Sequence, residues 1–175
     1  VAQLSQGDPQ QDRLLFERHQ PHLHALLRPV LRLKTRRLVA QILKPRHLGV
    51  DGRYQPAQDL RADHLGAAYS AKLDLWTLRN AIHQLRSVGP GRPLFILPVH
   101  YETLAVSELR ATYLEVAAMV PRLQRNRLMV LLVDPPPRLP AARITELLEL
   151  TNDFARFRAV EVRADSLEVD DLKGA

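Results

Sequence analysis

The stretch LLRPVLRLKTRRLVAQIL, residues 26–43, sets the fold class of this chain of 175 residues. Its two apolar runs, residues 26–33 and 38–43, flank a polar four-residue segment, and this pattern is typical of a β-hairpin. Pro45 lies two residues beyond the second run. Because proline cannot donate a hydrogen bond to a neighbouring strand, we expect the second strand to end there.

The segment before the hairpin is predicted to be helical. Asp8 followed by Pro9 is a good helix start, with a capping residue and then proline at the first helical position. We expect one helix over residues 8–27, kinked or split at Pro21. Residues 46–70 carry several glycines and prolines and are interpreted as a loop, with one short strand near residues 65–69.

Downstream of residue 70 the periodicity alternates. Apolar residues at spacings of three and four predict helices that begin near Leu73 and Ser107, and a third around residues 144–148. Gly89-Pro90-Gly91 is expected to end the first of them. Wholly apolar runs predict buried strands at residues 94–97, 128–133 and near 159–162. This alternation predicts an α/β fold with a parallel sheet and covering helices.

Composition excludes several classes of protein. The chain has no cysteine, so disulfides, thiolate catalysis and Cys-ligated zinc are ruled out. No apolar run approaches the ~20 residues that a membrane-spanning helix needs. The net charge is +6, which can indicate nucleic acid, lipid or a phosphorylated ligand. We interpret the basic residues as scattered among acids on an ordinary surface. With 5% aromatic residues, we do not expect nucleic acid as the partner.

Few residues are candidates for chemistry. His19, His22 and His24 are close in sequence, but they lack the i, i+4 spacing that would place them on one helical face around a metal, and we predict no metal site there. His100 and Asp134 follow two predicted strands, where open α/β sheets place their chemistry. Hydrolysis through this pair is one alternative function, since both can exchange protons.

The order of these pieces resembles the EAL domains, the phosphodiesterases of cyclic di-GMP signalling. Residues 28–40 are similar to the opening QPIVDLRTGRVVG, which the family continues with VEALLRW. Residues 73–81 are similar to the family's D-W-L-A helix, residues 94–104 to the SVNLS strand, and residues 127–135 to RLVLEITES. The resemblance spans about residues 24–163. It implies a (β/α) barrel that begins with an antiparallel strand pair and is incomplete here, because too few strands are present to close it.

The resemblance also implies that the family's metal-dependent hydrolysis is lost. The family binds divalent cations through carboxylates and one Asn, since hard cations prefer oxygen ligands. Those positions fall on Ile42, Pro98 and Leu131, with one acid retained as Asp134, and the family's DDFG has no counterpart near residues 160–164. We therefore predict a catalytically inactive member, with no catalytic residue, no metal and no cofactor.

Two arginines occupy positions where the family contacts nucleotide. Arg46 matches the Arg of ExLxR, and Arg28 replaces the Gln before the first proline. Either guanidinium could form bidentate hydrogen bonds with phosphate or guanine, so both arginines are candidates for nucleotide binding. The alternative is that both are ordinary surface arginines.

These inferences give the expected organisation and function. We expect an N-terminal helical segment at residues 1–24 and a degenerate EAL-like domain at 25–175. Val1 suggests a fragment of a longer protein. The predicted function is that of a non-catalytic regulatory module in bacterial signalling, cytoplasmic, acting through a protein partner or self-association. The alternatives are a cyclic di-GMP or other nucleotide sensor without hydrolysis, and a basic nucleic-acid-binding domain.

Overall fold

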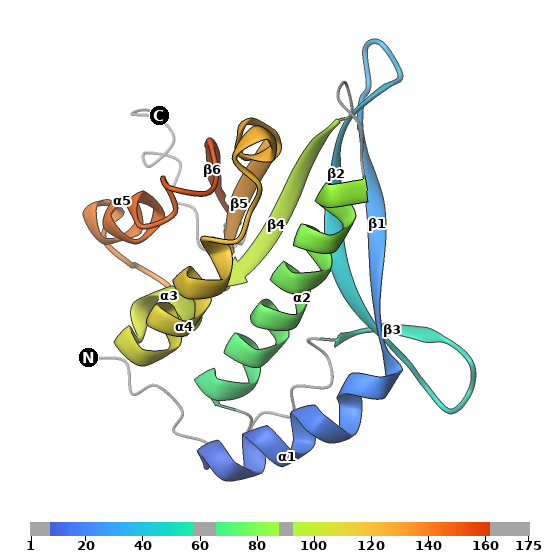
Figure 1. Cartoon of the computed structure of the whole chain (residues 1–175), viewed down its shortest axis with the longest axis vertical. Coiled ribbons are helices and arrows are strands. Elements are labelled where there is room, and N and C mark those ends of the chain that lie inside the picture. The colour runs from blue at the N-terminus through green and yellow to red at the C-terminus, as the bar shows by residue number, and fades with distance from the viewer. Residues whose placement is uncertain (1–7, 58–65, 88–92, 162–175) are drawn as a thin grey trace.

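The computed structural model describes residues 8–57, 66–87 and 93–161. They form one mixed sheet with helices packed on it (Figure 1). The strand order is β1-β2-β4-β5-β6, and the short β3 pairs with β2 outside this path. β1 and β2 are antiparallel, whereas β4, β5 and β6 each pair in parallel with the preceding strand of the path. The expected α/β class, antiparallel opening and unclosed barrel are confirmed for this part of the chain.

The hairpin is the longest pair of the sheet. β1 covers Leu23–Arg32 and β2 covers Arg37–Leu48, with the turn at residues 33–36. The prediction that Pro45 ends the second strand is wrong. Pro45 pairs with Ala25 inside the β1–β2 ladder. The pairing of β2 with β4 stops at Ile42, so a residue without an N–H is tolerated at a point where β2 has lost one neighbour.

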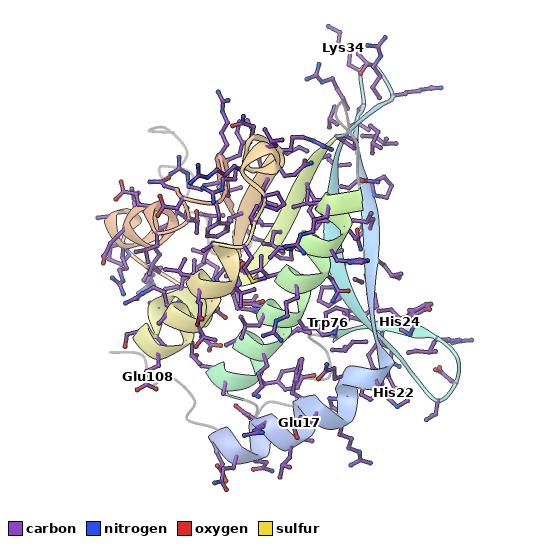
Figure 2. The ribbon with its side chains drawn as sticks, viewed as in Figure 1. Glu17, His22, His24, Lys34, Trp76 and Glu108 are labelled. Atoms are coloured by element: carbon purple, nitrogen blue, oxygen red, sulfur yellow. The ribbon has the colours of Figure 1, made fainter. Side chains whose placement is uncertain are left out.

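The first helix is shorter than predicted. α1 covers Pro9–His19 and is followed by a 3-10 turn, η1, at Gln20–His22. Asp8 caps α1 as expected, since its Oδ1 accepts a hydrogen bond from the backbone of Gln10 at 2.9 Å. Pro21 prevents continuation of the α-helix, and the chain beyond it pairs with β2 instead. Figure 2 shows His22 and His24 at this corner and Lys34 at the far tip of the hairpin.

The expected strand near residues 65–69 is also wrong, because Ala67 begins a helix. α2 covers Ala67–Ser87, and Tyr69 lies in its first turn. Tyr69 and Leu73 are one helical turn apart and pack against α1 in a small core with Phe16, Leu23 and Ala57. Burial against α1 thus decides the structure of an ambiguous segment. The predicted stop at Gly89-Pro90-Gly91 and residue 65 lie outside the described residues.

The second half follows the predicted alternation. β4 covers Leu94–His100, α3 Tyr101–Ala105, α4 Ser107–Ala117 and the 3-10 helix η3 Arg122–Arg127. β5 covers Leu128–Val133, α5 Ala141–Glu149 and β6 Phe157–Val160, while β3 is Tyr54–Pro56. None of the helices in the described ranges is long and apolar enough to span a membrane.

The main core lies on one face of the sheet. Phe95 pairs with Leu128, Leu97 with Val130 and Val99 with Leu132. Because residues two apart in a strand share a face, these side chains form one apolar layer, which packs with α2, α4 and α5. The members of this core that are fully shielded from solvent are Leu43, Leu78, Ala81, Leu97, Val99, Leu104, Tyr113, Ala117, Leu128, Val130, Leu132 and Leu147.

Candidate functional site

The strand register brings the three predicted metal-ligand positions together. Ile42 pairs with Ile96 of β4, and Pro98, two residues further on, pairs with Leu131 of β5. Alternate residues share a face, so Ile42, Pro98 and Leu131 lie on the same face, opposite the main core. None of these three side chains carries an oxygen or nitrogen donor. This donor set does not fit a hard divalent cation, which needs oxygen ligands.

An open hollow of about 430 Å³ lies along this face. Arg28 pairs with Ile42 across the hairpin and lines the hollow. Arg46 lies four residues beyond Ile42 on the same strand face but does not line it. The structure therefore brings one of the two nucleotide candidates to the predicted site and leaves the other outside. The lining residues are Arg28, Pro29, Val30, Ile42, Lys44, Leu131 and Glu161.

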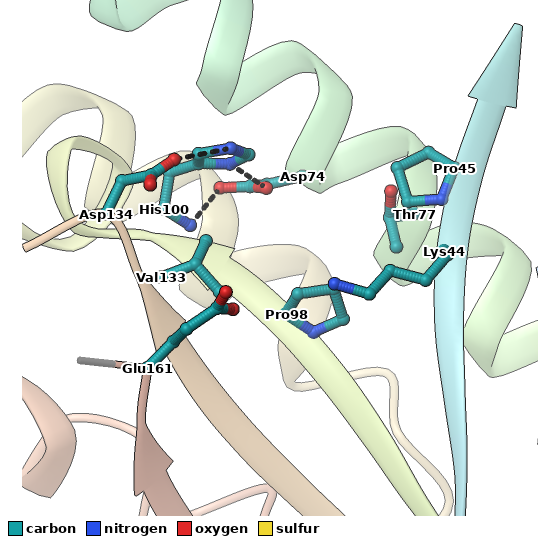
Figure 3. A pocket seen from close by; sticks show the side chains of 9 residues that line it. All are labelled: Lys44, Pro45, Asp74, Thr77, Pro98, His100, Val133, Asp134 and Glu161. Atoms are coloured by element: carbon teal, nitrogen blue, oxygen red, sulfur yellow. Dashed lines mark hydrogen bonds and ion pairs between the residues drawn. The ribbon is translucent and has the colours of Figure 1, made fainter. Parts of the chain in front are cut away.

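A smaller pocket, about 40 Å³, adjoins the hollow at the carboxyl ends of the parallel strands. Lys44 and Glu161 line both spaces. Figure 3 shows that His100, Asp134 and Glu161 reach this pocket from the ends of β4, β5 and β6. Asp74 enters from α2. Sequence patterns singled out His100 and Asp134, and the structure places them side by side.

His100 is held by a buried carboxylate. Its Nδ1 lies 2.8 Å from Oδ1 of Asp74, and its backbone N–H donates to Oδ2 of Asp74 at 2.9 Å. Because a carboxylate only accepts, Nδ1 carries the proton and Nε2 faces the pocket mouth. There Nε2 lies 3.8 Å from Oδ2 of Asp134, whose side chain is two-thirds exposed at 67%. The geometry fixes the ring so that it can exchange a proton at Nε2.

Asp74 also organises the start of α3. The hydroxyl of Thr103 donates to Oδ2 of Asp74 at 2.6 Å, and His100 is the residue that precedes this helix. Asp74 is 3% exposed and Thr103 is fully buried. Burial, with a smaller effect from the charge of Asp74, raises the pKa of Tyr113 well above its ordinary value. One carboxylate therefore ties α2 to the β4–α3 junction.

Sequence reasoning missed Asp74, Lys44 and Glu161 as residues of the site. Glu161 immediately follows β6, so an acid after an apolar run was the available signal. Asp74 stands among leucines in a helix, and a lone acid in an apolar stripe is a sign of a buried polar contact. Lys44 follows the apolar run of β2, but nothing in the sequence shows which face it occupies.

A histidine cluster forms at the other side of the hairpin base. The rings of His19 and His22 stand edge-on to the ring of His47, with centroids 5.5 Å and 5.6 Å away. Nδ1 of His19 lies 3.2 Å from the hydroxyl of Tyr69. No sequence pattern indicated that His47 belongs to this group. In the part of the chain that the structure covers, no group of three or more His, Asp or Glu side chains is arranged to hold a metal.

Mild acid is expected to destabilise this corner. Burial and the charges of neighbouring histidines lower the pKa of both His19 and His47 below the usual value of about 6.5. A lowered pKa in the folded state means that the neutral ring is favoured by folding. This stabilisation is present above pH 6.5 and is lost as the pH falls through the folded-state pKa. Urea denaturation at pH 7.5 and 5.5 should show a smaller pH-dependent loss for His47→Gln than for the parent. An equal pH-dependent loss of stability in His47→Gln and in the parent would contradict this prediction.

Comparisons with known proteins support the fold. No protein-family model matches the sequence, and no curated protein matches it. Solved EAL domains do match. The chain aligns with the structure of LapD from Vibrio cholerae bound to c-di-GMP, at 14% identity and a TM-score of 0.65, covering 94% of this chain and 41% of that chain.

Two further structures agree. The FimX EAL domain of Pseudomonas aeruginosa, bound to c-di-GMP, aligns at 16% identity and TM-score 0.59, covering 91% of this chain and 65% of that one. The Bacillus subtilis YkuI protein, in complex with substrate c-di-GMP and calcium, aligns at 13% identity and TM-score 0.65, covering 95% of this chain and 42% of that one. The structural neighbours of this chain are thus EAL domains, and the chain spans less than two thirds of each of these three.

Proposed function

We propose that the chain is a non-catalytic regulatory module with the EAL fold, acting in cyclic di-GMP signalling in the cytoplasm. The observation that carries the proposal is the common face shared by Ile42, Pro98 and Leu131. The resemblance assigns these positions to metal ligands, and three side chains without donors cannot bind two cations. The signalling context is supported by the likeness in fold to solved EAL domains that are bound to c-di-GMP.

The proposed mode of action is binding of a protein to the face of the sheet that no helix of the described residues covers. Helices cover the opposite face, whereas this one carries half-buried Ile42, Ile96 and Leu131 and the 40%-exposed Leu26. An apolar face of this kind is stabilised by removal from water. A second copy of the chain is the partner we propose first.

A phosphodiesterase assay tests the loss of chemistry. The chain should not hydrolyse cyclic di-GMP with Mg²⁺ or Mn²⁺, because the apolar positions leave no paired cations to activate water. Among the acid–base groups of the pocket, His100 and Asp134 are the pair at the ends of β4 and β5. Turnover above the protein-free blank that disappears in His100→Ala would overturn the proposal.

Self-association is tested separately, by light scattering of the parent chain and of Leu131→Lys. Leu123→Lys, at a leucine that is 89% exposed outside this face, is the matched control.

A nucleotide ligand is the second candidate. Arg28 and Lys44 line the same hollow, and two cations can hold a phosphate without a metal. Calorimetry with cyclic di-GMP distinguishes the candidates. Binding that is lost in Arg28→Ala, but kept in Arg53→Ala at an exposed position outside the hollow, would favour sensing. No heat with the parent chain would exclude it.

A further inference from the structure

The positive charge of the chain is concentrated in the hairpin rather than scattered. No acid occurs between Glu17 and Asp51. Residues 20–50 contain seven of the 25 lysines and arginines and none of the 19 acids, which leaves 18 basic and 19 acidic residues in the rest of the sequence. The net charge of +6 therefore originates in the hairpin and its flanks, which corrects the interpretation of an evenly mixed surface.

Four of these cations gather at the hairpin tip. Arg32, Lys34, Arg36 and Arg37 lie within six residues, and all are exposed. Figure 2 shows Lys34 at the outer end of the turn, which extends beyond the rest of the sheet. Arg32 and Arg37 are direct cross-strand partners. Like charges directly opposite one another are unfavourable in a hairpin, and an anion between them would remove this repulsion.

The same tip exposes apolar side chains. Leu33, in the turn, is 90% exposed, and Leu31 is 52% exposed. Leu31 pairs with Leu38, and the next residue, Val39, forms a bulge. Leu38 and Val39 are 42% and 37% exposed. Successive strand residues point to opposite faces, so Leu31 and Leu38 share one face while Arg32 and Arg37 share the other. The tip is thus both cationic and amphipathic.

We propose that the hairpin tip, residues 31–39, binds an anionic phospholipid surface. The leucines would enter the boundary between headgroups and acyl chains, and the long basic side chains would reach back to the phosphates. Nucleic acid would use the cations but gain nothing from an exposed Leu33. Residues 18–53 also contain no Phe or Trp that could stack on bases. The combination of charge and exposed leucine therefore favours lipid.

The position of the tip leaves the candidate site free. The tip joins the end of β1 to the start of β2, whereas Lys44 lies near the other end of β2. His100 is the last residue of β4, which runs parallel to β2. The pocket therefore opens at the end of the sheet away from the tip. Binding of the tip to a surface is compatible with the proposed function and does not depend on it.

Vesicle sedimentation tests the proposal. The full chain should sediment with mixed vesicles of phosphatidylcholine and phosphatidylglycerol, far less with phosphatidylcholine alone, and less at high salt. Each basic residue near an anionic surface strengthens partitioning about fivefold, so the triple variant Arg32→Gln, Lys34→Gln, Arg37→Gln should lose roughly 100-fold. Leu33→Ser should lose roughly tenfold, since it removes apolar area from the contact.

Two control variants separate the tip from general charge. Arg53→Gln, Arg79→Gln, Arg122→Gln removes the same charge from exposed positions elsewhere, and Leu123→Ser removes an equally exposed leucine. Both should bind anionic vesicles as the parent does. Equal losses in the tip and control variants would overturn the proposal. So would competition by duplex DNA together with unchanged vesicle binding in Leu33→Ser, which would instead identify a polyanion site.

Discussion

Replacement of Asp74 by alanine is expected to lower the free energy of unfolding by about 3–5 kcal/mol, because it removes one partner of a buried charged network. Asp74 is 3% exposed and accepts three hydrogen bonds, two from His100 and one from Thr103. Alanine leaves all three donors without that acceptor, and a buried unsatisfied donor costs about 1–3 kcal/mol. Urea denaturation followed by circular dichroism measures the change.

Two further variants make the result specific. Asp74→Asn keeps one oxygen acceptor and should lose less than Asp74→Ala. Glu115→Ala removes an exposed acid from α4 and should stay within about 0.5 kcal/mol of the parent. If Asp74→Ala unfolds at the same urea concentration as Glu115→Ala, the network does not join α2 to the β4–α3 junction in solution.

Replacement of Phe16 by alanine is expected to cost about 3 kcal/mol, the lower end of the range for a buried phenylalanine. Phe16 is 6% exposed. Its ring meets the ring of Tyr69 edge-on, with centroids 5.9 Å apart. It packs with Leu23 and Leu73 in the small core between α1 and α2, called here the second core. The loss falls at the low end because this core is small and peripheral.

This variant also tests the proposed boundary at residue 24. The second core joins Phe16 and Leu23, before the boundary, to Tyr69 and Leu73, after it. We expect one cooperative transition, so Phe16→Ala should shift the whole unfolding curve. Leu14→Ala, at a residue that is 67% exposed, is the matched control. If only the amides of α1 lose protection in hydrogen exchange while the main transition stays in place, residues 1–24 form an appendage.

Local patterns predicted the second half of the chain well. The apolar run 128–133 is β5 without any change of bounds, and the start at Ser107 is the start of α4. Both segments contribute side chains to the main core, so the apolar run of β5 and the apolar spacing of α4 are clear in the sequence. The segments near α1 were predicted less well. The predicted helix over residues 8–27 ends before Pro21, at His19. Tyr69, which was placed in a short strand near residues 65–69, is helical and packs on Phe16.

The candidate site divides in the same way. The sequence placed His100 and Asp134 at strand ends, and it placed apolar residues at Ile42, Pro98 and Leu131. It could not show that Asp74, 26 residues before His100, fixes the histidine ring, since that contact depends on how α2 packs on the sheet. It also could not show that His47 joins His19 and His22, because β2 and η1 meet only after the hairpin closes.

The sequence by itself determined the antiparallel opening, the alternation of helices and strands, and the concentration of charge between residues 20 and 50, because each depends on neighbouring residues alone. The tertiary structure decided which side chains share a face. The side-chain period of a strand is two, so a register shift of one residue would move Ile42 or Leu131 to the opposite face. Only the pairing of β2, β4 and β5 places them with Arg28, Lys44 and Glu161 around one hollow.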